Sequence, residues 1–103
     1  MIKGTTPTIQ YNLPFDSSLI KKAEIVLKYV DANKETLIVK NLEDCILGDK
    51  CISAKLTQEE TILLPAPSFV EVQLRVVTTD ETIMATEPEK VMVKRLLKED
   101  VIE

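Results

Sequence analysis

The sequence predicts an all-β domain, a β-sandwich of seven to eight strands with one short helical turn near residues 57–62. Two adjoining segments carry this prediction. Residues 69–78 alternate between apolar and polar side chains, which is typical of a strand with one buried face. The preceding segment 56–61, Leu-Thr-Gln-Glu-Glu-Thr, is typical of a single capped helical turn. A turn of this kind between two strands indicates that the chain crosses there from one sheet to the other.

The composition is that of one globular domain, spanning residues 1–103. The apolar fraction of 45% can supply a two-layer core without metal ions or disulfides. The net charge of −4 arises in the second half of the chain, so we expect no nucleic-acid partner and no anionic membrane surface. No apolar run approaches the ~18 residues of a membrane span, and the N-terminal residues lack a signal-peptide pattern. We therefore expect cytoplasmic synthesis and no membrane insertion.

The first strand is expected at residues 8–13, between Pro7 and Pro14. Prolines at both ends suit an edge or terminal strand, because proline donates no backbone hydrogen bond. Asp and Ser within 15–18 favour a turn, since their side chains can bond nearby backbone amides.

The next expected strand is 21–30, which is rich in β-branched residues and alternates in polarity. A helix that begins near Ser17 and Ser18 is the alternative for this segment. Residues 31–34 are expected to form a hairpin turn, followed by a strand at 35–40.

A second hairpin is expected around Gly48, between the segments 44–47 and 50–56. Thr57 then begins a capping box, in which its hydroxyl accepts from the amide of Glu60 and the carboxylate of Glu60 accepts from the amide of Thr57.

Pro65 and Pro67 limit the helix to one or two turns. We expect the long strand that follows to bury its apolar stripe in the core. The stripe consists of Val70, Val72, Leu74 and Val76. The remaining expected elements are a turn at 79–82 and strands at 83–86 and 90–97.

Enzyme chemistry finds little support in the residue types. The chain has no histidine, which excludes Ser-His and Cys-His catalysis. The adjacent acids Glu43-Asp44 and Asp80-Glu81 point to opposite faces if they lie on strands, and Glu59-Glu60 is explained by helix capping. The acids Asp80, Glu81, Glu87 and Glu89 form either a solvated rim or, as the less favoured alternative, a calcium site. We therefore predict no enzyme, no catalytic residue, no cofactor and no metal site.

The two cysteines, Cys45 and Cys51, lie on either side of Gly48. If the hairpin is centred on Gly48 they would face each other at disulfide distance, whereas in a reducing compartment two free thiols are expected. The sequence leaves both alternatives open.

Several strands carry apolar residues on both faces, which predicts a contact surface. Val26 and Val30 alternate with the core-facing residues of 21–30, and apolar residues follow one another at 91–93. We expect a self-association surface there, and thus a possible homo-oligomer. A carbohydrate-binding module would instead require exposed aromatic side chains. The chain has four aromatic residues, Tyr11, Phe15, Tyr29 and Phe69, and at least two are expected in the core.

The order of a strand ending at Leu56, a helical turn and a long alternating strand resembles the E-to-F crossing of immunoglobulin-like and fibronectin-like domains. The chain lacks a core tryptophan, a corner tyrosine and an inter-sheet cysteine pair at the usual separation. The resemblance therefore implies the architecture of these domains and carries no function with it.

A second resemblance covers nearly the whole chain. Four segments, Gly4–Thr8, Leu13–Asp16, Leu56–Thr61 and Val72–Arg75, are similar to small uncharacterised proteins encoded in prophages of Firmicutes, among tail or baseplate genes. This resemblance implies a non-enzymatic phage structural or adaptor protein that contacts other virion or phage proteins, and association with the virion is one expectation that follows from it. It carries over no active residues. The alternative function is the carbohydrate- or host-surface-binding β-module.

Overall fold

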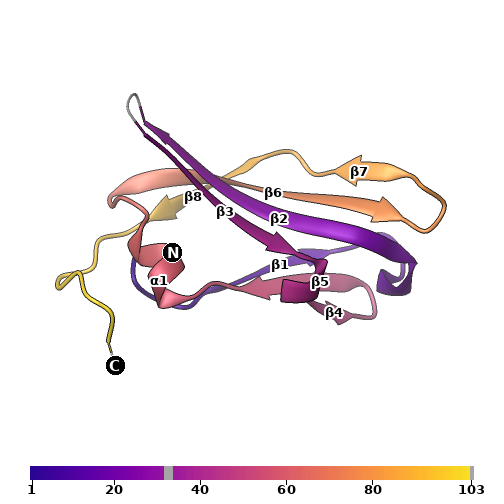
Figure 1. The fold of residues 1–103 in the computed structure, drawn as a ribbon, viewed down its shortest axis with the longest axis horizontal. Coiled ribbons are helices and arrows are strands. Elements are labelled where there is room, and N and C mark those ends of the chain that lie inside the picture. The colour runs from indigo at the N-terminus through magenta and orange to yellow at the C-terminus, as the bar shows by residue number, and fades with distance from the viewer. Residues whose placement is uncertain (32–33, 103) are drawn as a thin grey trace.

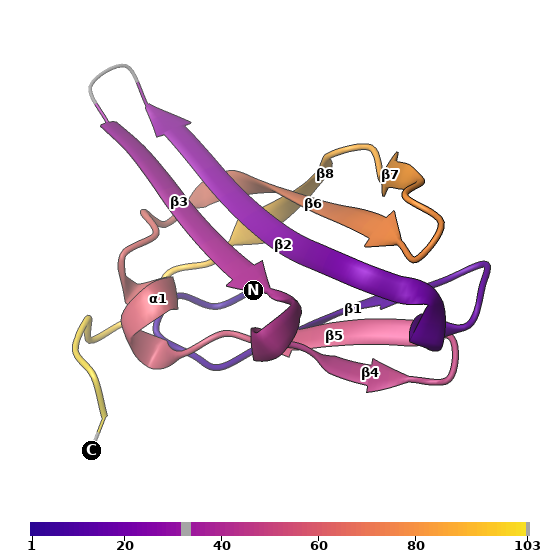
Figure 2. The same ribbon diagram turned by 45° about the vertical axis from the view of Figure 1, so that its right-hand side comes forward.

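The computed structural model describes residues 1–31 and 34–102. Two antiparallel sheets face each other, one of three strands and one of five (Figures 1 and 2). The three-stranded sheet has the order β1-β5-β4, and the five-stranded sheet has the order β3-β2-β6-β7, with β8 also paired to β6. The predicted all-β sandwich is confirmed.

The elements of the described residues are eight strands, one α-helix and two short 3-10 turns. The strands are β1 Thr8–Asn12, β2 Ile20–Asp31, β3 Lys34–Asn41, β4 Ile46–Gly48, β5 Cys51–Lys55, β6 Ser68–Thr78, β7 Ile83–Ala85 and β8 Glu89–Val93. The helical elements are α1 Gln58–Ile62 and the 3-10 turns η1 Ser17–Leu19 and η2 Leu42–Asp44.

The core lies between the two sheets and is built around β6. Its predicted stripe is confirmed, because Val70, Val72, Leu74 and Val76 expose only 0 to 4% of their surface. Across the core, β5 contributes Ile52, which is fully buried. Burying each such side chain contributes about 1.5–3 kcal/mol to folding, so this stripe anchors the sandwich.

β2 is the centre of the five-stranded sheet, where it pairs with both β3 and β6. The strand interpretation of 21–30 is therefore confirmed and the helical alternative is wrong. Helical structure near its start is limited to η1, where the Asp16 carboxylate accepts a hydrogen bond from the amide of Ser18. Figure 1 shows the β2–β3 hairpin extending beyond the body of the sandwich. The expected turn at 31–34 includes residues 32–33, which lie outside the described part.

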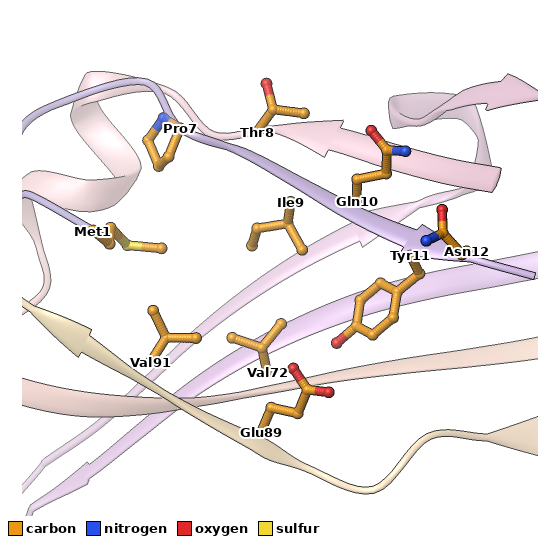
Figure 3. Close-up of a pocket in the computed structure, with 10 residues that line it drawn as sticks. All are labelled: Met1, Pro7, Thr8, Ile9, Gln10, Tyr11, Asn12, Val72, Glu89 and Val91. Carbon is orange, nitrogen blue, oxygen red and sulfur yellow. The ribbon is translucent and has the colours of Figure 1, made fainter.

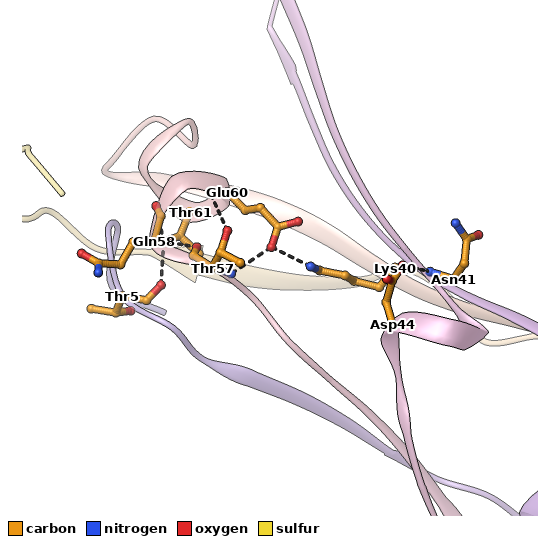
Figure 4. A network of polar contacts seen from close by, with 8 residues as sticks. All are labelled: Thr5, Lys40, Asn41, Asp44, Thr57, Gln58, Glu60 and Thr61. Carbon is orange, nitrogen blue, oxygen red and sulfur yellow. Dashed lines mark hydrogen bonds and ion pairs between the residues drawn. The ribbon is translucent and has the colours of Figure 1, made fainter. Parts of the chain in front are cut away.

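The capped turn α1 joins β5 in one sheet to β6 in the other, as expected (Figures 1 and 4). The amide of Glu60 donates to Thr57 Oγ1 at 3.1 Å, and the amide of Thr57 donates to Glu60 Oε1 at 2.8 Å. The predicted capping box is confirmed. Buried Thr61 donates from Oγ1 to the carbonyl of Thr5 at 2.7 Å, which ties the turn to the N-terminal segment.

Most strand boundaries differ from the predictions by one or two residues, and the largest difference is at the last strand. The last strand was expected at 90–97, but β8 ends at Val93, opposite Ser68. Pro67 precedes Ser68 and has no N–H to continue the ladder, so Lys94 instead bridges to Ile2 of the N-terminal segment.

The second hairpin is also shifted from its expected centre at Gly48. Gly48 pairs with Cys51, so Asp49 and Lys50 form the turn. Because Gly48 has no Cβ, its backbone can lie against the Cys51 sulfur, a site that any larger residue would crowd.

Candidate interaction surface

The acidic residues that the sequence places in pairs form separate contacts with nearby residues. Glu60 accepts from Lys40 Nζ at 2.7 Å (Figure 4), and although burial acts to raise the pKa of Glu60, the hydrogen bonds from Lys40 and from the Thr57 amide hold it below its usual value. Asp80 accepts hydrogen bonds from Thr78 and Thr82 in the turn after β6, and these bonds lower the pKa of Asp80. These carboxylates brace turns of the chain.

The acidic rim considered as a calcium site is divided in the same way. Asp80 is engaged in its own turn, and Glu81 forms an ion pair with Lys21. Among residues 1–31 and 34–102, no group of three or more cysteine and acidic side chains is placed to hold a metal ion.

The two cysteines are free thiols, so the disulfide alternative is wrong. The hairpin turns at Asp49 and Lys50, which places Cys51 opposite Gly48 and leaves Cys45 outside the ladder, before Ile46. Cys45 Sγ instead donates to the carbonyl of Asn41 at 3.2 Å, and burial raises the pKa of its thiol.

The outer face of the three-stranded sheet is polar. Its outward side chains alternate with the core-facing Ile9, Tyr11, Ile52 and Ala54. They are Thr8, Gln10 and Asn12 of β1 and Cys51, Ser53 and Lys55 of β5. On β4, Ile46 pairs with Ser53 and is 74% exposed, which makes it an isolated apolar residue on this face.

The outer face of the five-stranded sheet is apolar in three places. The hairpin patch lies on β2 and β3 and consists of Val26, Val30, Leu37 and Val39. The other two places are the cross-strand pairs Phe69 with Met92 and Val77 with Ile83.

The hairpin patch adjoins charged side chains on the same face. Val26 lies beside Val39, and Leu37 lies beside Lys28, which pairs with Glu35 at 3.6 Å. Glu24 and Arg75 form a cross-strand ion pair at 2.5 Å. Apolar side chains bordered by ion pairs resemble the core and rim of a protein–protein interface.

A groove of about 460 Å³ runs along β1 at the side of the sandwich (Figure 3). Ile9 and Tyr11 point into it from β1, and Val72 and Val91 face them from β6 and β8. Burial raises the pKa of the Tyr11 hydroxyl, and the nearby charge of Glu89 acts in the same direction.

The aromatic residues divide unevenly between core and surface. Tyr11, Phe15 and Tyr29 are half-buried and pack against the core, whereas Phe69 is 57% exposed. Sequence reasoning missed the exposed Phe69, although it shares the period-two stripe of Glu71, Gln73 and Arg75 on the outer face. It also missed the groove, because its lining residues on β1, β6 and β8 are far apart in the sequence.

Comparison with known proteins adds no relative: no family model matches the chain, and no curated protein or solved structure does. None of the helices in the described residues has the length and apolar character needed to cross a membrane.

Proposed function

We propose that this chain is a non-enzymatic structural or adaptor protein that acts through protein–protein contacts. The observation that supports it best is the hairpin patch. Val30 and Leu37 are 63% and 53% exposed on paired strands. Covering apolar surface contributes roughly 25 cal/mol per Å², so a partner that covers this patch gains binding free energy from it.

The outward position of these residues is fixed by the pairing of β2. Its other face carries Ala23, Ile25 and Leu27, all buried in the core. A register slip that hid the hairpin patch would expose that core face, so the sheet holds the patch toward solvent. Large exposed apolar groups in clusters mark interaction sites more often than single ones do.

The proposed setting is a phage tail or baseplate, with other virion or phage proteins as partners. Support for this setting comes from the sequence resemblance of Gly4–Thr8, Leu13–Asp16, Leu56–Thr61 and Val72–Arg75 to prophage-encoded proteins. Three of these segments have a structural place in this fold. Leu13–Asp16 forms the turn before η1, Leu56–Thr61 contains the α1 cap, and Val72–Arg75 is the centre of β6.

The proposal is tested by co-expressing the chain with the tail and baseplate proteins encoded next to it, followed by light scattering on the purified complex. We expect a complex of defined stoichiometry that Leu37→Ser weakens at least tenfold. The matched control is Ile46→Ser, the same change at an exposed residue of the other sheet. Absence of any complex, or equal loss with both variants, contradicts the proposal.

The second candidate is a carbohydrate- or host-surface-binding β-module, and the exposed ring of Phe69 is the observation that favours it. Aromatic rings form stacking platforms for sugars. Titration of the chain with host cell-wall polysaccharide, compared between Phe69→Ala and the unmodified protein, distinguishes this candidate. Saturable binding that depends on Phe69 supports it, and absence of binding removes it.

A further inference from the structure

The free edge of β1 offers hydrogen-bonding groups that no residue among 1–31 and 34–102 uses. The hydrogen bonds at the two ends of β1 show which of its residues bond to β5. The amide of Leu56 donates to the Pro7 carbonyl, and the amide of Leu13 donates to the Lys50 carbonyl. In an antiparallel ladder, hydrogen-bonded pairs alternate with non-bonded pairs. In the β1–β5 register Ile9 and Tyr11 therefore bond to β5, while Thr8, Gln10 and Asn12 direct their N–H and C=O groups away from it.

β1 is the edge strand least protected against pairing. Edge strands are usually protected against pairing with another chain by charged side chains or by being very short. β3 carries Glu35 and Lys40, β8 carries Glu89 and Lys90, and β4 and β7 have three residues each. β1 has five residues, Thr-Ile-Gln-Tyr-Asn, and none is charged.

The groove beside β1 provides space for the side chains of an added strand. Val72 and Val91 of the facing sheet lie at the floor of the groove, opposite Ile9 and Tyr11. A strand added next to β1 would place its inward side chains beside Ile9 and Tyr11, at the open side of this groove. This edge therefore favours an extended segment that has apolar or aromatic residues at every second position.

We propose that this segment is β1 of a second copy of the chain, paired antiparallel about a two-fold axis at Gln10. In this register Gln10 faces Gln10, Thr8 faces Asn12, and Ile9 faces Tyr11. Each outward N–H of Thr8, Gln10 and Asn12 can then donate to an outward C=O of the second copy. This works because the three residues are two apart along the strand and so direct their backbone groups to the same side. The two amide side chains at the axis can bond each other, and no like charges meet.

The pairing is self-complementary on both faces of the strand, which is the requirement for an isologous dimer. It joins the two three-stranded sheets into one continuous sheet with a polar outer face, and it leaves both hairpin patches free. Because five paired residues cover less area than a standard interface, we expect a dissociation constant in the micromolar range.

Sedimentation equilibrium tests the proposal through residue 10, which lies on the axis. The unmodified chain should approach twice its mass of 11.6 kDa as concentration rises through the micromolar range. Gln10→Lys alone and Gln10→Glu alone should each weaken the dimer at least tenfold, because like charges meet at the axis. Mixing the two variants should restore it, because opposite charges then meet. Gln10 is exposed in the single chain, so both variants should keep their melting temperature.

Two matched variants assign the dimer to its surface. Ile46→Lys places the same charge on the same sheet, two strands from β1, and should leave the dimer unchanged. Leu37→Ser tests the hairpin patch and should also leave it unchanged. A chain that stays monomeric at millimolar concentration overturns the proposal. So does a dimer that survives both Gln10 variants, or one that Leu37→Ser abolishes. None of these three results contradicts binding of phage proteins through the hairpin patch, which the co-expression experiment tests separately.

Discussion

The two sheets of this sandwich present opposite kinds of surface to solvent. The three-stranded sheet has a polar outer face and a free, uncharged edge at β1. The five-stranded sheet has apolar patches on its outer face, while its edge strands carry charges or are short. A sheet can associate through its edge by backbone hydrogen bonds or through its face by side-chain burial. The difference indicates that one sheet of this molecule is suited to the first mode and the other to the second.

The largest expected effect is a difference in the free energy of unfolding between substitutions on the inner and on the outer face of the five-stranded sheet. Leu74 is 4% exposed and Leu37 is 53% exposed. Leu74→Ala should lower the free energy of unfolding by about 3 kcal/mol because it leaves a cavity, and Val72→Ala by about 2 kcal/mol. Leu37→Ala should change it by less than about 0.5 kcal/mol. Urea denaturation measures all three, and comparable losses at Leu74 and Leu37 would mean that the faces are assigned wrongly.

The next effect concerns the close approach of Gly48 to Cys51 in the three-stranded sheet. A Cβ at position 48 would overlap the Cys51 sulfur, so Gly48→Ala should cost about 1–2 kcal/mol of stability. Combining it with Cys51→Ala removes the overlapping atom and should recover most of that loss. Simple additivity of the two single changes in the double-mutant cycle would contradict the contact.

The crossing between the sheets should respond to loss of its cap. Thr57→Ala removes the hydroxyl that accepts from the Glu60 amide and should cost about 1 kcal/mol. Thr57→Ser keeps the hydroxyl and serves as the control. A melting temperature that is the same for the alanine variant and the unmodified chain would count against the capping box.

The smallest effect is a dependence of stability on pH that comes from Glu60. Its pKa is lowered in the folded chain from a usual value of 4.5, so its contribution is present above pH 4.5 and is lost as pH falls through the folded pKa. The difference in unfolding free energy between the unmodified chain and Glu60→Gln should therefore shrink as the pH is lowered below 4.5. Glu59→Gln is the control at a neighbouring exposed acid. A difference that stays constant with pH would show that Lys40 and Thr57 do not hold the charged form.

The sequence predicted features that depend on residues close together in the chain. The Thr57–Glu60 box needs only a spacing of three residues, and the β6 stripe needs only period two, so both were found in the structure. The β4–β5 register was missed because the sequence did not show that Asp49 and Lys50, rather than Gly48, form the turn. The early end of β8 was missed because it depends on Pro67, more than twenty residues earlier.

The candidate surfaces were predictable only in part. Val26 and Val30 were recognised as outward apolar residues from alternation in β2, but their neighbours Leu37 and Val39 required the pairing with β3. The free edge of β1 required the complete strand order, because no local pattern states which neighbours a strand lacks.

Amide hydrogen exchange along β1, followed by NMR, tests the contrast between edge and face most directly. In dilute protein, the amides of Ile9 and Tyr11 should exchange slowly, and those of Thr8, Gln10 and Asn12 should exchange fast. At high concentration these three fast amides should become protected from exchange, while the exchange rates of the amides in the hairpin patch stay unchanged. Equal protection of all five amides in dilute protein would contradict the free edge, because it would mean that the chain already covers that edge by itself.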